Sequence, residues 1–145
     1  MQDRFRFRYS YNNHIYNVLG IDFDFSRAVL HSLVGTETLM CKINLDNLIP
    51  CTGKMDKNGI PIYEGDIVKI FHVSGTMQGK YFFDVIEWND LRCRFETKNY
   101  GIIDDDDIYE VIGNIYENPE LLKEWKCTCT LIKYLLYQKI NALVM

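Results

Sequence analysis

Hydrophobic and polar residues alternate along the first third of the chain, and turn-forming residues interrupt the alternation about every 8–12 positions. Residues 4–9 place Phe5, Phe7 and Tyr9 on one face and arginines on the other, the pattern of a half-buried strand. Similar segments predict further strands over 14–21, 27–33 and 39–43. The N-terminal part is therefore expected to form an antiparallel meander.

Two turn signals lie close together in the middle of the chain. They are Asp56-Lys57-Asn58-Gly59 and Glu64-Gly65-Asp66. Asn-Gly favours a type I′ hairpin turn, in which both central residues have positive φ. Before them, residues 44–48 fit either a helical turn or an extended link ending at Pro50. After them, strands are predicted over 67–73, 80–88, 91–97 and 108–115. Short, bent strands of this kind indicate a small SH3-like β-barrel.

The pattern changes after Asn118-Pro119, because Asn is a favoured N-cap and Pro is favoured in the first helical turn. A helix is therefore predicted from Glu120 to about Leu143, with one apolar stripe. The stripe consists of Ile132, Leu136, Ile140 and Leu143. Lysines interrupt every window long enough to cross a bilayer, so no membrane span is expected. The stripe predicts a homo-oligomer, with packing against the protein's own barrel as the alternative.

The predicted fold is thus all-β with a C-terminal helix. Residues 1–50 are expected to form the meander, residues 51–118 the SH3-like barrel and residues 119–145 the helical extension.

Two blocks of sequence, TG-x-x-DKNG-x-x-IYEGDIV and VIGNIYENPELL, resemble the signature of the YopX family of phage and prophage proteins. The resemblance covers about residues 4–123 and implies an all-β protein with a meander and a small barrel. It assigns no activity, and the motif residues have adequate structural reasons for their positions. We call the following the signature residues: Thr52, Gly53, Asp56, Asn58, Gly59, Tyr63, Glu64, Gly65, Asp66, Gly113, Asn114, Tyr116, Asn118 and Pro119. The chain departs from the family pattern at Cys51, where an aromatic residue is expected, and in residues 125–145, which extend past the usual end.

The composition narrows the possible functions. The net charge is −4, and hydrophobic residues make up 48% of the chain, so it is globular. The five cysteines are an odd number. No signal-peptide pattern opens the sequence, so reduced thiols in the cytoplasm of a bacterial host cell are expected. Cys127-x-Cys129 lacks a second pair, and neither a metal nor a cofactor is predicted.

Arg4, Arg6 and Arg8 offer a candidate nucleic-acid contact, because side chains on one strand face recur about every 6.6 Å. The acidic net charge disfavours this interpretation, and the alternative is a solvated strand face. Glu64 and Asp66 flank a glycine and could in principle serve as an acid–base pair, but a simpler interpretation is that Asp66 accepts backbone N–H bonds in the turn. The acidic run 104–107 is expected to be a solvated loop.

Tyr63, Tyr116 and Trp88 are either a recognition face or core residues. Nucleophile and phosphate-loop motifs are missing, so the chain is not expected to be an enzyme. The sequence favours a non-catalytic interaction module that self-associates and binds an unknown host or phage protein. The alternative is a nucleic-acid-binding protein that uses the arginine strand.

Overall fold

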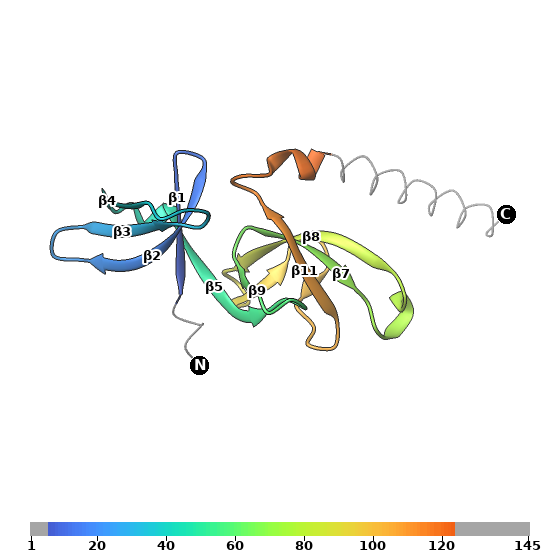
Figure 1. Ribbon diagram of the computed structural model, residues 1–145. Helices are drawn as coiled ribbons and strands as arrows, with labels where there is room; N and C mark the ends of the chain where they lie inside the picture. The colour runs from blue at the N-terminus through green and yellow to red at the C-terminus, as the bar shows by residue number, and fades with distance from the viewer. Residues whose placement is uncertain (1–5, 124–145) are drawn as a thin grey trace.

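The computed structural model describes residues 6–123, which form two antiparallel sheets arranged as two lobes (Figure 1). The first sheet has the order β4-β3-β2-β1-β5-β6 and the second has the order β10-β9-β8-β7-β11. The first sheet contains β1 (Phe7–Tyr11), β2 (His14–Asp22), β3 (Arg27–Ser32), β4 (Thr38–Lys42), β5 (Leu48–Met55) and β6 (Pro61–Tyr63). The second contains β7 (Asp66–Phe71), β8 (Tyr81–Asn89), β9 (Arg94–Thr97), β10 (Gly101–Ile102) and β11 (Ile108–Asn114). The all-β prediction is confirmed.

Strands β1 to β4 form the predicted meander, which we call the N-terminal lobe. Its core is built by alternate side chains, with Tyr9, Ala28 and Leu30 at 0–1% exposure. Asn12 and Asn13 connect β1 to β2 and have φ values of 49° and 62°. This Asn-Asn pair therefore forms a type I′ turn, since asparagine tolerates the left-handed region better than most residues.

Strand β5 runs through both lobes, and its extent was not predicted. It follows the short 3₁₀ helix η2 (Leu45–Asn47), pairs with β1 at Leu48–Pro50 and then with β6 at Cys51 and Met55. It therefore crosses the position between residues 50 and 51 where the sequence suggested a boundary. Cys51 is buried at the junction, where its thiol contacts the Ile62 carbonyl oxygen at 3.6 Å.

The turn after β5 differs from the type I′ turn that the Asn58-Gly59 pair predicted. Only Gly59 has a positive φ, of 75°, while the Gly59 N–H donates to the Asp56 carbonyl oxygen at 3.0 Å. The reason is Asp56, whose Oδ1 accepts the amides of Asn58 and Ile60 at 2.8 and 2.9 Å. This carboxylate stabilises a longer loop with its glycine at the last position.

Asp56 also joins the two sheets. Its second oxygen, Oδ2, accepts the Val111 N–H at 3.1 Å, at the point where β11 shifts register against β7. The carboxylate is 6% exposed. A residue assigned by sequence to a local turn therefore also satisfies a buried amide 55 positions away.

The second sheet is open rather than closed, so the predicted SH3-like barrel is not confirmed. Residues 51–63, which the predicted barrel included, contribute to β5 and β6, and these two strands pair within the first sheet instead. The β5–β6 hairpin meets the second sheet through single backbone contacts, such as Lys57 N–H to Tyr109 O at 2.8 Å. Its core side chain Ile62 still packs with Val68, Ile70 and Ile86 in one cluster.

The described chain ends in a helical segment over residues 119–123, in agreement with a helix start after Asn118. Asn118 Oδ1 accepts the Asn114 N–H at 3.2 Å, and a side chain on Gly113 would lie 2.7 Å from that oxygen. The predicted oligomer stripe lies outside the described residues. Within the described part of the chain, no helix is long and apolar enough to cross a bilayer.

Replacing Asp56 by alanine tests its role as the tie between the sheets. The three amides that it accepts lose their partner, so Asp56→Ala is expected to lower the free energy of unfolding by about 2–4 kcal/mol. Urea denaturation followed by circular dichroism measures the change. Alanine at the exposed Asp24 serves as the control and is expected to change stability by less than about 0.5 kcal/mol. Equal effects of the two substitutions would contradict the assignment.

Candidate functional site

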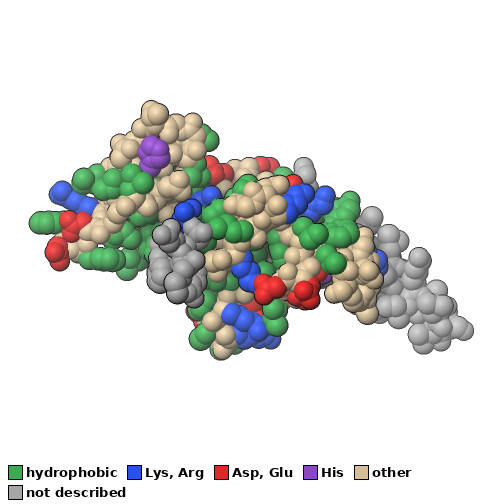
Figure 2. Space-filling view, turned by 60° about the horizontal axis from the view of Figure 1, so that its bottom comes forward, with side chains coloured by type: hydrophobic (Ala, Val, Ile, Leu, Met, Phe, Trp, Pro, Cys, Tyr) green, Lys and Arg blue, Asp and Glu red, His purple; other side chains and the backbone are tan. Residues whose placement is uncertain are grey.

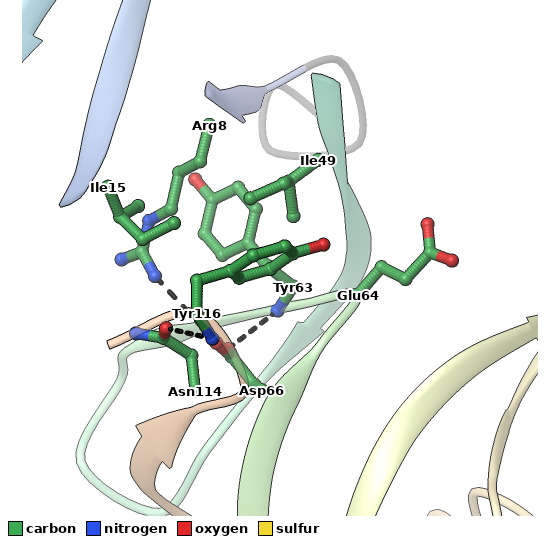
Figure 3. Close-up of a pocket in the computed structure, with 8 residues that line it drawn as sticks. All are labelled: Arg8, Ile15, Ile49, Tyr63, Glu64, Asp66, Asn114 and Tyr116. Atoms are coloured by element: carbon green, nitrogen blue, oxygen red, sulfur yellow. Dashed lines mark hydrogen bonds and ion pairs between the residues drawn. The ribbon is translucent and has the colours of Figure 1, made fainter. Parts of the chain in front are cut away.

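Five of the signature residues line a small hollow at the junction of the two lobes (Figure 3): Tyr63, Glu64, Asp66, Asn114 and Tyr116. About 170 Å³ of space lies between its atoms, part of it open solvent, and no room for a water-sized sphere is enclosed. Drug-sized ligands occupy pockets of roughly 300–1,000 Å³, so the hollow is too small for one. Its walls come from β1, β2, β5, β6, β7, β11 and the turns next to them: Arg8, Ile15, Ile49, Tyr63, Glu64, Asp66, Asn114 and Tyr116.

Asp66 is the buried charge of this junction. It is 2% exposed, and its Oδ2 accepts the Tyr63 N–H at 2.8 Å. Burial raises the pKa of this carboxyl from 3.8 to about 7, against the lowering effects of the Tyr63 amide and the Arg8 guanidinium. The neighbouring carboxylate of Asp56 raises the pKa further. Asp66 is therefore partly protonated at neutral pH. The sequence-based expectation that it accepts a turn amide is confirmed, but its burial was not foreseen.

Arg8 reaches into the same junction from β1. Its guanidinium carbon lies 4.1 Å from the centre of the Tyr63 ring, and its Nη1 lies 3.9 Å from Asp66 Oδ1. Its side chain is 17% exposed, and its Nε is buried without a hydrogen-bond partner among the described residues. The guanidinium thus acts as a cation stacked on an aromatic ring.

The predicted arginine ladder is divided by this contact. Arg6 is exposed, Arg8 lies in the junction and Arg4 falls outside the described residues. A nucleic-acid contact by these side chains stays a prediction, and Arg8 has an internal role in the fold.

Gly65 and Tyr116 account for the tight approach of the two signature blocks. Gly65 has φ of 81°, and a Cβ added there would lie 2.8 Å from Tyr116 Cε2. Only glycine combines that backbone conformation with so close a ring. Burial raises the pKa of the Tyr116 hydroxyl, and the nearby carboxylates of Glu64 and Asp66 raise it further.

The other signature residues complete local hydrogen bonds. The Thr52 hydroxyl donates to the Ile62 carbonyl oxygen at 2.8 Å. Asn114 Oδ1 accepts the amides of Tyr116 and Glu117 at 3.1 and 2.9 Å. Gly53 has φ of 82°, as a left-handed position in β5 requires. These contacts agree with the interpretation that the signature specifies the fold.

Glu64 and Asp66 do not face each other as an acid–base pair. The Glu64 carboxylate points away from Asp66 in Figure 3, and no histidine among the described residues lines the hollow. Among residues 6–123, no group of three or more His, Cys, Asp or Glu side chains is placed to hold a metal ion. Trp88, the third aromatic considered, is 41% exposed on β8 and lies outside the hollow.

The acidic run 104–107 is held by specific contacts. Asp107 pairs with His72 Nδ1 at 2.8 Å, Asp105 pairs with Lys54, and Asp104 Oδ1 accepts the Asp106 N–H. The predicted solvated loop is therefore partly ordered by side chains from two other segments.

Comparison with known proteins identifies the family of the chain and one similar structure. A family model described as YopX protein matches residues 4–123. The chain belongs to the YopX family. The crystal structure of protein EF1440 from Enterococcus faecalis is similar, with 25% identity and a TM-score of 0.53. That match covers 81% of this chain and 96% of EF1440. No curated protein matches the sequence.

The titration of Asp66 predicts a pH-dependent stability. Between pH 4 and 7 the folded state of this YopX protein holds a proton that the unfolded state releases, so stability falls as pH rises through this range. Relative to Asp66→Asn, which cannot titrate, the wild-type protein is expected to lose about 2–3 kcal/mol between pH 5 and pH 8. Urea denaturation at both pH values measures the difference.

The control is asparagine at the exposed Asp90, for which the difference from wild type should not follow the same pH course. A wild-type-minus-Asp66→Asn difference that is constant with pH would show that this carboxyl titrates normally in the folded protein.

Proposed function

We propose that this YopX protein is a non-catalytic interaction module, encoded by a phage and active in the cytoplasm of the bacterial host. It associates with itself and binds a host or phage protein. Membership of the YopX family and the likeness to EF1440 support the fold on which this proposal rests.

The way the signature residues are used favours a binding role over catalysis. Asp56, Asp66 and Asn114 direct their side-chain oxygens at backbone amides of their own chain. A general acid or base must instead reach a substrate. These signature residues therefore stabilise the fold, and the surface of the protein that binds a partner has to lie elsewhere.

Exposed aromatic residues at the tip of the N-terminal lobe carry the proposal. Phe23 and Phe25 lie in the turn between β2 and β3 and are 74% and 71% exposed. The turn itself is defined, since Asp22 Oδ1 accepts the Phe25 N–H at 3.1 Å. Aromatic side chains displayed on an ordered hairpin are typical anchors of protein–protein interfaces. Figure 2 shows hydrophobic side chains gathered over this lobe.

The same geometry makes nucleic acid the weaker alternative. A strand that binds phosphates needs its arginines free and regularly spaced, whereas Arg8 is stacked on Tyr63 and faces Asp66. The protein's net charge of −4 also repels a polyanion such as nucleic acid.

Affinity capture from phage-infected host cells tests the proposal. We expect the wild-type protein to retain a stoichiometric protein partner after nuclease treatment, and Phe23→Ser/Phe25→Ser to lose most of it because the aromatic anchors are gone. Mass spectrometry of the captured proteins gives the readout. Leu91→Ser is the control, since Leu91 is 96% exposed in the β8–β9 turn of the other sheet. Partners that disappear with nuclease would favour the nucleic-acid alternative.

Self-association through Ile132, Leu136, Ile140 and Leu143 is tested by truncation after Glu124. Removing the apolar stripe is expected to reduce the mass of the oligomer measured by light scattering, because its burial would no longer offset the entropy lost on association. An unchanged mass would rule out this segment as the contact.

A further inference from the structure

Among residues 6–123, strand β4 is an open edge of the first sheet. It ends the strand order, and β3 is its partner along the other side. Two hydrogen bonds flank the pairing of β3 with β4: Ile43 N–H to Ser26 O at 2.8 Å and Ser32 N–H to Glu37 O at 2.9 Å. They show which residue pairs between them are hydrogen-bonded, because hydrogen-bonded and non-hydrogen-bonded pairs alternate along an antiparallel ladder. In that alternation Leu39 and Cys41 bond to β3. Thr38, Met40 and Lys42 direct their backbone N–H and C=O groups away from the sheet.

This edge lacks the features that usually block strand addition. Its sequence, TLMCK, contains no proline, and its pairing with β3 contains no bulge. Lys42 is its single charged residue and lies at its end. Edges protected against pairing carry central charges, prolines or bulges.

The outer face next to this edge is apolar. Val29 of β3 pairs with Met40 of β4 and with Gly20 of β2. Directly paired residues lie on the same face of a sheet, so these three residues share one face. The bulge of β2 between Val18 and Gly20 turns Leu19 to solvent, and Leu19 and Met40 are each 62% exposed. Gly20 adds no side chain, and the space above it is empty. A row of Leu19, Val29 and Met40 therefore crosses the sheet and stops at the open edge.

We infer that β4 pairs with β4 of a second copy of this chain, antiparallel about a two-fold axis through Met40. In this register Met40 faces Met40, and Thr38 faces Lys42, so every outward-directed backbone group of the strand gains a partner. A two-fold axis requires such self-complementarity.

Side chains support the same register. Leu39 lies opposite Cys41 on the inner face, and the apolar row on the outer face continues unbroken into the second copy. Lys42 lies opposite Thr38, whereas a register centred on Lys42 would place two lysines face to face. A shift centred on Leu39 leaves Lys42 of each copy beyond the end of the paired strand.

This inference rests on the self-association in the proposed function and places a contact on β4, separate from the stripe over 132–143. Phe23 and Phe25 lie outside the strand and stay available to another partner. Loss of the β4 contact with unchanged capture through Phe23 and Phe25 would thus leave partner binding intact.

Light scattering of the full-length chain tests the contact, using variants that place a positive or a negative charge at the two-fold axis. Met40→Lys and Met40→Glu are each expected to have half the wild-type mass, because like charges meet at the two-fold axis. An equimolar mixture of the two variants is expected to recover the wild-type mass. Met55→Lys is the matched control, since Met55 is 44% exposed at the end of β5.

Wild-type protein that scatters as a single 17.1 kDa chain would overturn the inference. So would Met40→Lys with unchanged mass, or a mixture that stays at half mass. Because Met40 is exposed, circular dichroism of both variants should match the wild type, and recovery on mixing shows directly that each variant is folded.

Discussion

Carboxylates buried at chain reversals satisfy the amides that the sheets leave unpaired. Asp56, Asp66 and Asp84 are 6%, 2% and 2% exposed. Asp84 accepts the amides of Asn99 and Tyr100 at 2.8 and 3.2 Å, as Asp56 and Asp66 do for their own loops. A buried N–H without a partner costs about 1–3 kcal/mol, so loops this close to the core require such acceptors. The two sheets can approach each other because these side chains replace water at their margins.

Local pattern predicted most of the strands, and the reasons for the exceptions are physical. β2, β3 and β8 were located to within one or two residues at each end. β5 was missed because Pro50 and Gly53 interrupt the strand pattern and because its partner changes from β1 to β6 along its length. The pairing of β6 with β5, which leaves the second sheet open, depends on contacts that no local period encodes.

The candidate site was only partly visible in the sequence for a related reason. Turn chemistry indicated that Asp66 accepts an amide and that Asp56 lies in a turn, but the burial of both side chains depends on which segments cover them. Arg8 shows the limit most clearly. Its alternation with Tyr9 predicted a solvent-facing side chain, which holds only where a single face of the strand is covered. At the junction, Tyr63 and Asp66 cover the other face as well.

The passage of β5 from one lobe to the other limits where the chain can be divided. Modular proteins exchange parts at linkers, where few contacts cross the joint. Here a break near residue 50 would cut the paired strand β5 and separate Ile49 from Cys51, which belong to one buried cluster. Each lobe would then expose a strand end that is now paired. Recombination within the gene would therefore preserve a folded product when it moves both lobes together, which makes the pair of lobes, rather than either lobe, the unit of genetic exchange.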